Sequence, residues 1–138
     1  VPEHAAKYPE GNMFGQLPAY AFYARHVEGL TLRNIQTRWE EEDLRPALLF
    51  DDAKDLTVDG FQAGTASAGA PVIWLNRAID AVFRGASVPP VAVFVRVSGE
   101  QTRNVAVLGS DLSQADRVYE LVGVDARQAR ESGNLTRQ

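Results

Sequence analysis

Apolar and polar residues alternate in several short segments of the chain. Each segment places two apolar side chains two positions apart: Leu30 and Leu32, Leu56 and Val58, Ala81 and Phe83, Val105 and Val107. A period of two is the signature of a β-strand with one face buried, so these positions are predicted to point inward and Thr31 and Thr57 outward. A first apolar stretch precedes each alternating strand, at 21–24, 47–50, 72–75 and 91–95.

The segments form an internal repeat. The sequence at 23–35 lies over 49–61 at a shift of 26, the copy at 74–86 follows at a shift of 25, and the copy ending at 102–110 follows at a shift of 24. Each copy closes on Asn34 or a glycine, the residues that tolerate the left-handed backbone of a sharp turn. Each copy is therefore interpreted as one coil of a stacked structure.

A unit of about 25 residues cannot bury its own apolar face, whereas stacked copies build a continuous core. The predicted fold class is all-β, a parallel β-helix of about four to five coils. The leucine-rich repeat has a similar length, but its Leu-x-x-Leu-x-Leu pattern is missing. The alternative is a β-sandwich of eight short strands.

The two ends of the chain differ from its middle, so a single domain over 1–138 is divided into three parts. Residues 1–18 are predicted to be irregular, 19–112 to form coils, and 113–138 to form a C-terminal cap. The cap is expected to hold a last strand around 118–121 and a short helix over 126–130 with Asp125 as its N-cap. The N-terminal end of the stack is expected to be open, and upstream coils or a second copy of the chain would cover it.

Composition narrows the possible partners. The formal charge of −4 and the pI near 5.1 argue against a nucleic-acid partner, which needs a clustered basic surface. No apolar run is long enough to cross a membrane, and residues 1–12 do not resemble a signal peptide. With no cysteine and two histidines without ligand spacing, neither a metal site nor a cofactor is predicted.

The runs "LPAYAFYARHVEGLTLRN" (17–34) and "RPALLFDDAKDLTVDG" (45–60), with the closing "TRNVAVLGSDLSQADRVYEL" (102–121), resemble the C-terminal coils of polygalacturonase-like family 28 glycoside hydrolases, especially bacterial pectin-degrading members. The resemblance extends over residues 8–125. It implies a right-handed parallel β-helix, inverting hydrolysis of galacturonosyl linkages, a pectic or other uronate-containing polysaccharide as partner, and an extracellular or periplasmic location.

The catalytic motifs of that family lie upstream of the matched region. They are Asn-Thr-Asp, Gly-Asp-Asp, Gly-His-Gly and Arg-Ile-Lys, and none of them occurs in this chain. Asp51-Asp52 follows Phe50 rather than glycine and falls at a coil corner, opposite Arg25-His26 and Asn76-Arg77 of neighbouring copies. Because successive strand residues point to opposite faces, the pair is interpreted as structural, and no catalytic residue is predicted.

Two groups of residues are candidates for saccharide contact. Stacking the coils places Tyr23, Leu49 and Trp74 in one row, where Tyr23 and Trp74 either offer aromatic faces to sugar rings or are covered by protein. In the segment at 36–45, Trp39 stands beside Arg38 and Arg45, and an arginine fork suits a uronate carboxylate. The acidic run at 40–43 in the same segment would repel a polyuronate.

The sequence thus predicts the C-terminal part of a pectinase-like glycoside hydrolase that is inactive by itself. The alternative is a non-catalytic module that binds carbohydrate or associates with itself on the same scaffold.

Overall fold

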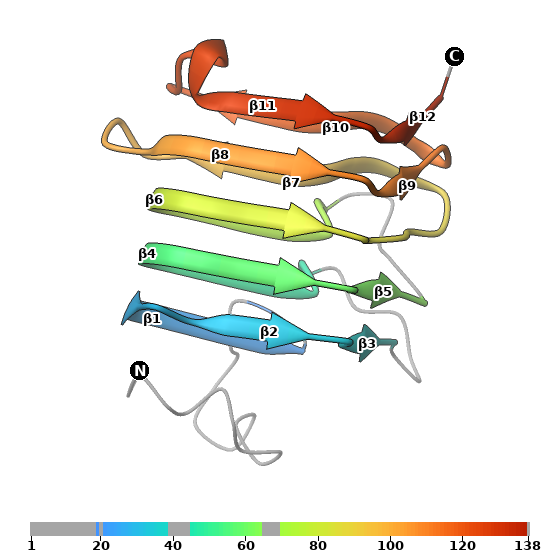
Figure 1. Ribbon diagram of the computed structural model, residues 1–138, viewed down its shortest axis with the longest axis horizontal. Helices are drawn as coiled ribbons and strands as arrows, with labels where there is room; N and C mark the ends of the chain where they lie inside the picture. Colours follow the sequence, from blue (N-terminus) through green and yellow to red (C-terminus); the bar gives the residue numbers. More distant parts are fainter. Residues whose placement is uncertain (1–18, 20, 39–44, 65–69, 138) are drawn as a thin grey trace.

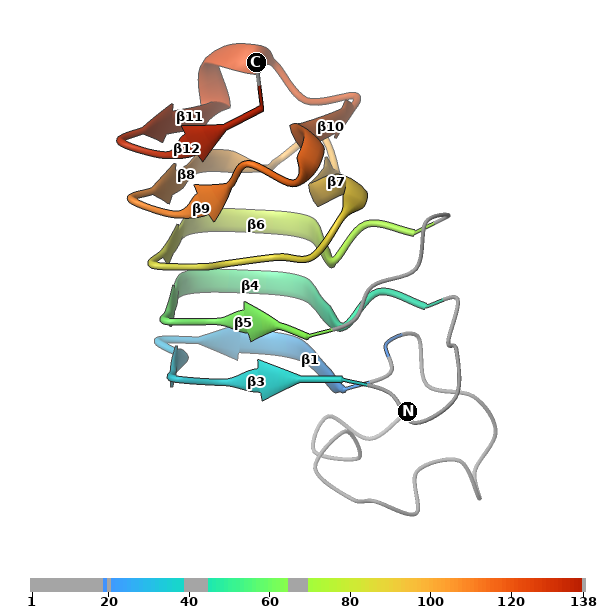
Figure 2. The same ribbon diagram turned by 90° about the vertical axis from the view of Figure 1, so that its right-hand side faces the viewer.

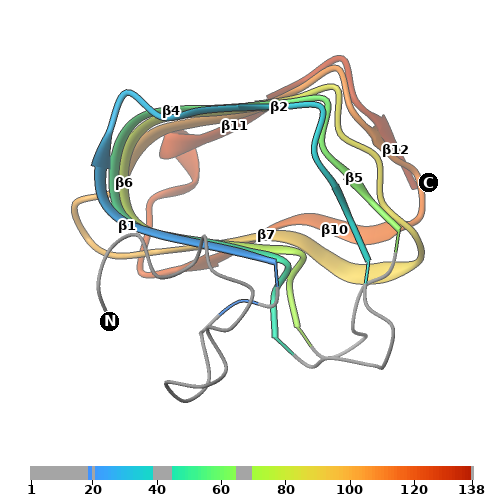
Figure 3. The same cartoon turned by 90° about the horizontal axis from the view of Figure 1, so that it is seen from below.

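The computed structural model describes residues 19, 21–38, 45–64 and 70–137, and it shows a parallel β-helix of about four turns. Seen from the N-terminal end, the chain runs clockwise as it recedes, so the helix is right-handed (Figure 3). The elements are β1 (Phe22–Glu28), β2 (Thr31–Arg33), β3 (Gln36–Thr37), β4 (Leu48–Asp59), β5 (Gln62–Ala63), β6 (Ile73–Arg84), β7 (Val91–Ser98), β8 (Arg103–Leu108), β9 (Asp111–Leu112), β10 (Ala115–Val122), η3 (Ala126–Gln128), β11 (Ala129–Ser132) and β12 (Leu135–Thr136).

Parallel pairing stacks the coils one above another (Figure 1). The first wall has the order β1-β4-β6-β7-β10, and β4 and β6 continue around a corner into a second wall, where they pair with β2 and β8. Val58 pairs with Phe83, and Phe83 with Val107, which confirms the predicted shifts of 25 and 24. The third wall is built from the short pairs β3–β5 and β9–β12 (Figure 2).

Left-handed backbone angles mark the corner between the second and third walls in each coil. The corner residues share a φ between +53° and +77° and are Asn34, Gly60, Gly85, Gly109 and Gly133. A side chain with a Cβ is strained in this region unless it is short and polar. This explains why the corner position holds asparagine in the first coil and glycine in the later coils. The predicted turn residues are confirmed.

The inward-facing residues of the three walls form the core of the helix. Leu56, Val58, Phe83 and Val107 are at most 1% exposed, which confirms that the alternating positions face inward. Phe83 meets Phe94 edge to face at a centroid distance of 6.4 Å, a favoured arrangement of aromatic rings. Paired strands of successive coils lie about 4.8 Å apart, so outward side chains of one row repeat at that spacing.

The fourth coil contains the predicted apolar stretch at 91–95 within β7, which extends it to Ser98. Val95 pairs with Ile73 and Val97 with Leu75, so only the second half of β7 lies over β6. The corner that follows is two residues longer than that of the preceding coil, because the shift between these two coils changes from 22 at Val95 to 24 at Val105. Thr102 holds this longer turn: its hydroxyl accepts from the Ala78 N–H and donates to the Ser98 carbonyl.

The C-terminal segment continues the coil pattern instead of ending as a helical cap. The last strand around 118–121 is confirmed within β10, and Asp125 accepts a hydrogen bond from the Arg127 N–H as the N-cap. The helix itself is a 3₁₀ turn of three residues, and β11 and β12 then pair with β8 and β9. The predicted helix over 126–130 is therefore too long, and strands extend past residue 112. The predicted irregular segment at 1–18 lies outside the described residues.

Candidate binding surfaces

An outward row of side chains crosses the first wall. The predicted alignment of Tyr23, Leu49 and Trp74 is confirmed, and Arg96 and Glu120 extend the same row through β7 and β10. Tyr23 and Leu49 are each 7% exposed and pack with Ala19 in a small apolar cluster separate from the main core. Tyr23 therefore has no open ring face, whereas Trp74 is half-buried.

Trp74 is held by two neighbours from the next coil. Its indole Nε1–H donates to Ser98 Oγ at 2.9 Å, and the guanidinium of Arg96 lies 5.2 Å from the centre of the ring. Arg96 Nε in turn donates to Glu120 Oε1 at 2.5 Å. A cation over an indole face is an attractive electrostatic contact, so one face of the Trp74 ring is already occupied by a side chain of the protein.

Asp51 and Asp52 both make contacts between coils. Asp51 accepts hydrogen bonds from both Nε and Nη2 of Arg77, at 2.9–3.0 Å, and from Asn76 Nδ2 at 2.9 Å. Asp52 stands at the corner with a φ of 59°, and its carboxylate meets His26 Nδ1 at 2.6 Å. The hydrogen bond with His26 lowers the pKa of Asp52. These contacts agree with the structural interpretation of the pair.

A depression of about 560 Å³ opens on the third wall, beside β3 and β5. Gln36, Gln62 and Ser87 line it in successive coils, Thr37 and Ala63 lie behind them, and Arg38 and Gly64 follow the two strands. Gln36 Nε2 donates to Gln62 Oε1 at 3.0 Å, so the two amides form a ladder. Among the predicted saccharide contacts that the structure describes, only Arg38 lines this depression.

The structure separates the predicted contact residues. Tyr23 and Trp74 belong to the first wall, Arg38 follows β3 on the third wall, and Arg45 is half-buried just before β4. Trp39 lies outside the described residues. Among the residues described, no group of three His, Asp or Glu side chains is placed to hold a metal ion. No helix within the described ranges has the length and apolar character needed to cross a bilayer.

Sequence reasoning missed Arg96, Glu120, Gln36 and Gln62. The sequence repeat gave no register for the part of the fourth coil before residue 102, so the alignment of Arg96 with Trp74 at a shift of 22 was not predicted. The pairing of Gln36 with Gln62 could have been predicted from the sequence, since the shift of 26 between the first two coils places one directly over the other.

No family model, curated protein or solved structure matches the chain. The fold places it among the β-solenoid proteins, and its class is established by the stacking of parallel coils.

Proposed function

We propose that the chain is the C-terminal part of a polygalacturonase-like glycoside hydrolase and that it is not catalytic by itself. The right-handed parallel β-helix is the fold that the resemblance of residues 8–125 implies. A pectic polysaccharide is the expected substrate of the complete enzyme, and the expected location is extracellular or periplasmic.

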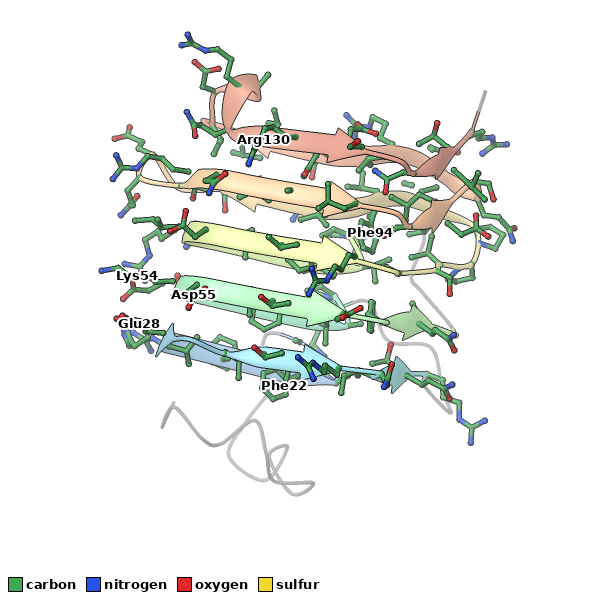
Figure 4. All side chains as sticks on the ribbon, viewed as in Figure 1. Phe22, Glu28, Lys54, Asp55, Phe94 and Arg130 are labelled. Carbon is green, nitrogen blue, oxygen red and sulfur yellow. The ribbon has the colours of Figure 1, made fainter. Side chains whose placement is uncertain are left out.

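The burial of the first coil carries the proposal. Phe22, Val27 and Leu32 are only half-buried, although their partners in the next coil, Leu48, Ala53 and Val58, are at most 1% exposed. Leu30 and Ile35 are half-buried as well. Phe22 lies at the lower edge of the described stack (Figure 4). An apolar surface of this kind fits a preceding coil, because stacked neighbours are what buries the faces of a solenoid.

The aspartate pair supports the absence of independent activity. Inverting hydrolysis needs one protonated and one ionised carboxyl about 6.5–9.5 Å apart, with room for water between them. Asp51 is paired with Arg77, and Asp52 with His26. A carboxylate that is held by an ion pair or a hydrogen bond that favours its ionised form is a poor proton donor, so these two residues do not supply the missing catalytic motifs.

A chimaera tests the proposal. A catalytically complete family member is truncated before its matching C-terminal coils and is then joined to this chain. We expect the isolated chain and the truncated enzyme to release no reducing ends from polygalacturonate, and the chimaera to regain activity. Leu32→Glu in the chimaera should abolish the gain, because it places a charge between stacked coils. Activity of the chain alone would refute the proposal, as would a folded but inactive chimaera.

A non-catalytic binding or self-association module is the second candidate. Trp74 beside Arg96 favours binding to a glycan, and the half-buried first coil favours association with a second copy. A glycan that quenches the fluorescence of the chain, with the response lost in Trp74→Phe, would favour the binding module. A dimer in light scattering that dissociates in Leu32→Glu would favour self-association.

A further inference from the structure

We propose that the last coil, built from β10, β11 and β12, is closed to stacking by a charged residue in a core row, so that copies of this chain do not join end to end. The residue is Glu131 on β11. This coil and the half-buried first coil lie at opposite ends of the stack (Figure 1). The proposal does not depend on the hydrolase function.

The backbone of the last coil is open to a further coil. β10 pairs with β7, β11 with β8 and β12 with β9, and within the described chain none of the three has a strand on its other side. Strands with unpaired N–H and C=O groups are templates for pairing with another chain. The side chains of the last coil therefore decide whether another chain stacks on it.

The first coil of a second copy matches this open edge. Because the coils pair in parallel throughout, its strands would run in the same direction as those of the last coil. Its inward residues Phe22, Leu30 and Leu32 are apolar and only half-buried. Contacts between the two different ends of identical copies repeat without closing and generate filaments. A stack of this kind needs a feature that stops growth at one end.

Glu131 supplies that feature. Val58 pairs with Phe83, Phe83 with Val107, and Val107 with Glu131, so the carboxylate occupies an inward row of the core. The three apolar residues of the row are at most 1% exposed, whereas Glu131, at the end of the row, is exposed. Of the ion pairs in the described chain, none includes Glu131.

A coil stacked on the last one would bury the carboxylate of Glu131. Leu32 begins the same row in the first coil, so in an end-to-end stack Leu32 of the second copy would lie about 4.8 Å above Glu131. An ionised carboxylate in apolar surroundings without a partner is strongly unfavourable. Inward-pointing charges are one of the means by which proteins protect exposed sheet edges.

Tyr119 covers part of the core at the same end. It lies over the buried Val95, and its hydroxyl donates to the Arg130 carbonyl at 2.6 Å, on the strand that carries Glu131. Burial and the charge of Glu131 raise the pKa of Tyr119, which agrees with a carboxylate close to the ring. The Tyr119 hydroxyl is thus satisfied within the last coil and needs no partner from another one.

Analytical ultracentrifugation of the 138-residue chain over a series of concentrations is the test. We expect Glu131→Leu to grow into species larger than a dimer, with an association constant at least ~10-fold above that of the unmodified chain. Glu131→Gln, which removes the charge and keeps the shape, should associate less strongly than the leucine variant. Glu120→Leu is the matched control: it makes the same change in the same coil at an outward position of β10 and should not promote growth.

A double variant identifies the surfaces that meet. Glu131→Leu combined with Leu32→Glu has an accepting last coil and a blocked first coil, so it should not grow alone. Mixed with the unmodified chain, it should form pairs that contain one copy of each and nothing larger. Circular dichroism of each variant checks that the coils are folded.

Three results would overturn the proposal. The first is unchanged association of both Glu131→Leu and Glu131→Gln. The second is growth of the unmodified chain or of Glu120→Leu into species larger than a dimer. The third is growth of the double variant alone, since its first coil is blocked. Because these readouts measure association of the isolated chain, failure of the chimaera experiment leaves them unaffected.

Discussion

Arg77 and Asp51 form a two-pronged ion pair across adjacent coils, with guanidinium nitrogens 2.9–3.0 Å from the carboxylate oxygens. The hydrogen bond and the charge of Asp51 raise the pKa of Arg77. Asn76 and Ser98 continue the contact: Ser98 Oγ donates to Asn76 Oδ1 at 2.8 Å and accepts from Trp74. Side chains of three coils are thus joined along the first wall.

Asp51→Asn should lower the thermal stability by roughly 2–5 °C, the scale of single-contact losses in domains of this size. Arg77→Gln should have a similar effect, and the double variant should lose less than the sum, because both changes remove one interaction. Thermal unfolding followed by circular dichroism measures the three shifts. Additive shifts would show that the pair does not couple the coils.

Gly99 should tolerate alanine much less well than Gly109. A Cβ at Gly99 would lie 2.8 Å from the Arg77 backbone nitrogen, and its φ of 97° is outside the usual left-handed well. At Gly109, with a φ of 53°, a Cβ would meet nothing within 4 Å. We expect Gly109→Ala to cost about 1 kcal/mol from strain alone and Gly99→Ala clearly more. Urea unfolding of both variants tests this order, and equal costs would contradict it.

Phe83→Ala should cost about 3–5 kcal/mol of unfolding free energy, the usual price of deleting a buried aromatic ring. Phe83 is fully buried and packs against Phe94. Phe22→Ala is the matched control, since Phe22 is half-buried in the first coil. In the isolated chain, Phe22→Ala should lower the unfolding free energy by less than half as much as Phe83→Ala does. Equal costs in urea unfolding would mean that the first coil is covered in solution.

The turn at Asp125 should lose stability in acid. The hydrogen bonds from the Arg127 side chain and backbone lower the pKa of Asp125 to about 2. A carboxyl whose pKa falls on folding stabilises the folded state above its unfolded pKa, near 3.8, and this contribution disappears as the pH falls through about 2. The Arg127 amide resonance should therefore titrate with a midpoint near pH 2.

Asp125→Asn is the control for this titration, because asparagine keeps an oxygen acceptor at the N-cap but has no carboxyl to protonate. Its Arg127 amide should show no transition between pH 4 and pH 2. A midpoint near pH 4 in the unmodified chain would contradict the predicted shift.

Asn134 should stabilise the last coil through its side chain. Its Nδ2 donates to the Val107 carbonyl and its Oδ1 accepts from the Ser110 N–H, each at 2.9 Å. Asn134→Ala leaves both backbone groups without these partners and should cost about 1–2 kcal/mol. Hydrogen exchange at the Ser110 amide should become at least 10-fold faster. Asn134→Asp keeps the acceptor, so exchange at Ser110 should change less than in the alanine variant.

Most of the stacked coils could be predicted from the sequence alone. The period of two in pairs such as Leu56 and Val58, repeated at near-constant spacing, predicted both the strands and their register. The spacing between repeats predicts the register because each inward side chain must lie over the inward side chain of the coil below. The turn at Asn34 and the glycines was predictable for a local reason, since few residues accept positive φ.

The fourth and fifth coils show where pattern reasoning fails. The corner before β8 holds two extra residues, and only the pairing of Val95 with Ile73 reveals them. In the last coil, β11 and β12 are largely exposed and polar, so their sequence carries little apolar alternation. These strands form because β8 and β9 offer hydrogen-bonding edges. Tyr119 also donates a hydrogen bond from its hydroxyl to the Arg130 carbonyl at 2.6 Å.

The sequence by itself determined that the chain folds as stacked parallel coils, because burial and turn chemistry repeat along it. The tertiary structure decided which outward residues meet. The indole of Trp74 lies under Arg96, and Arg38 lies beside the Gln36–Gln62 ladder. Outward positions carry no burial constraint that would reveal their neighbours in the sequence, so their contacts depend on corner lengths. Two extra residues in one corner change the shift that aligns two coils, so Arg96 lies over Trp74 at a shift of 22, whereas Val105 lies over Ala81 at a shift of 24.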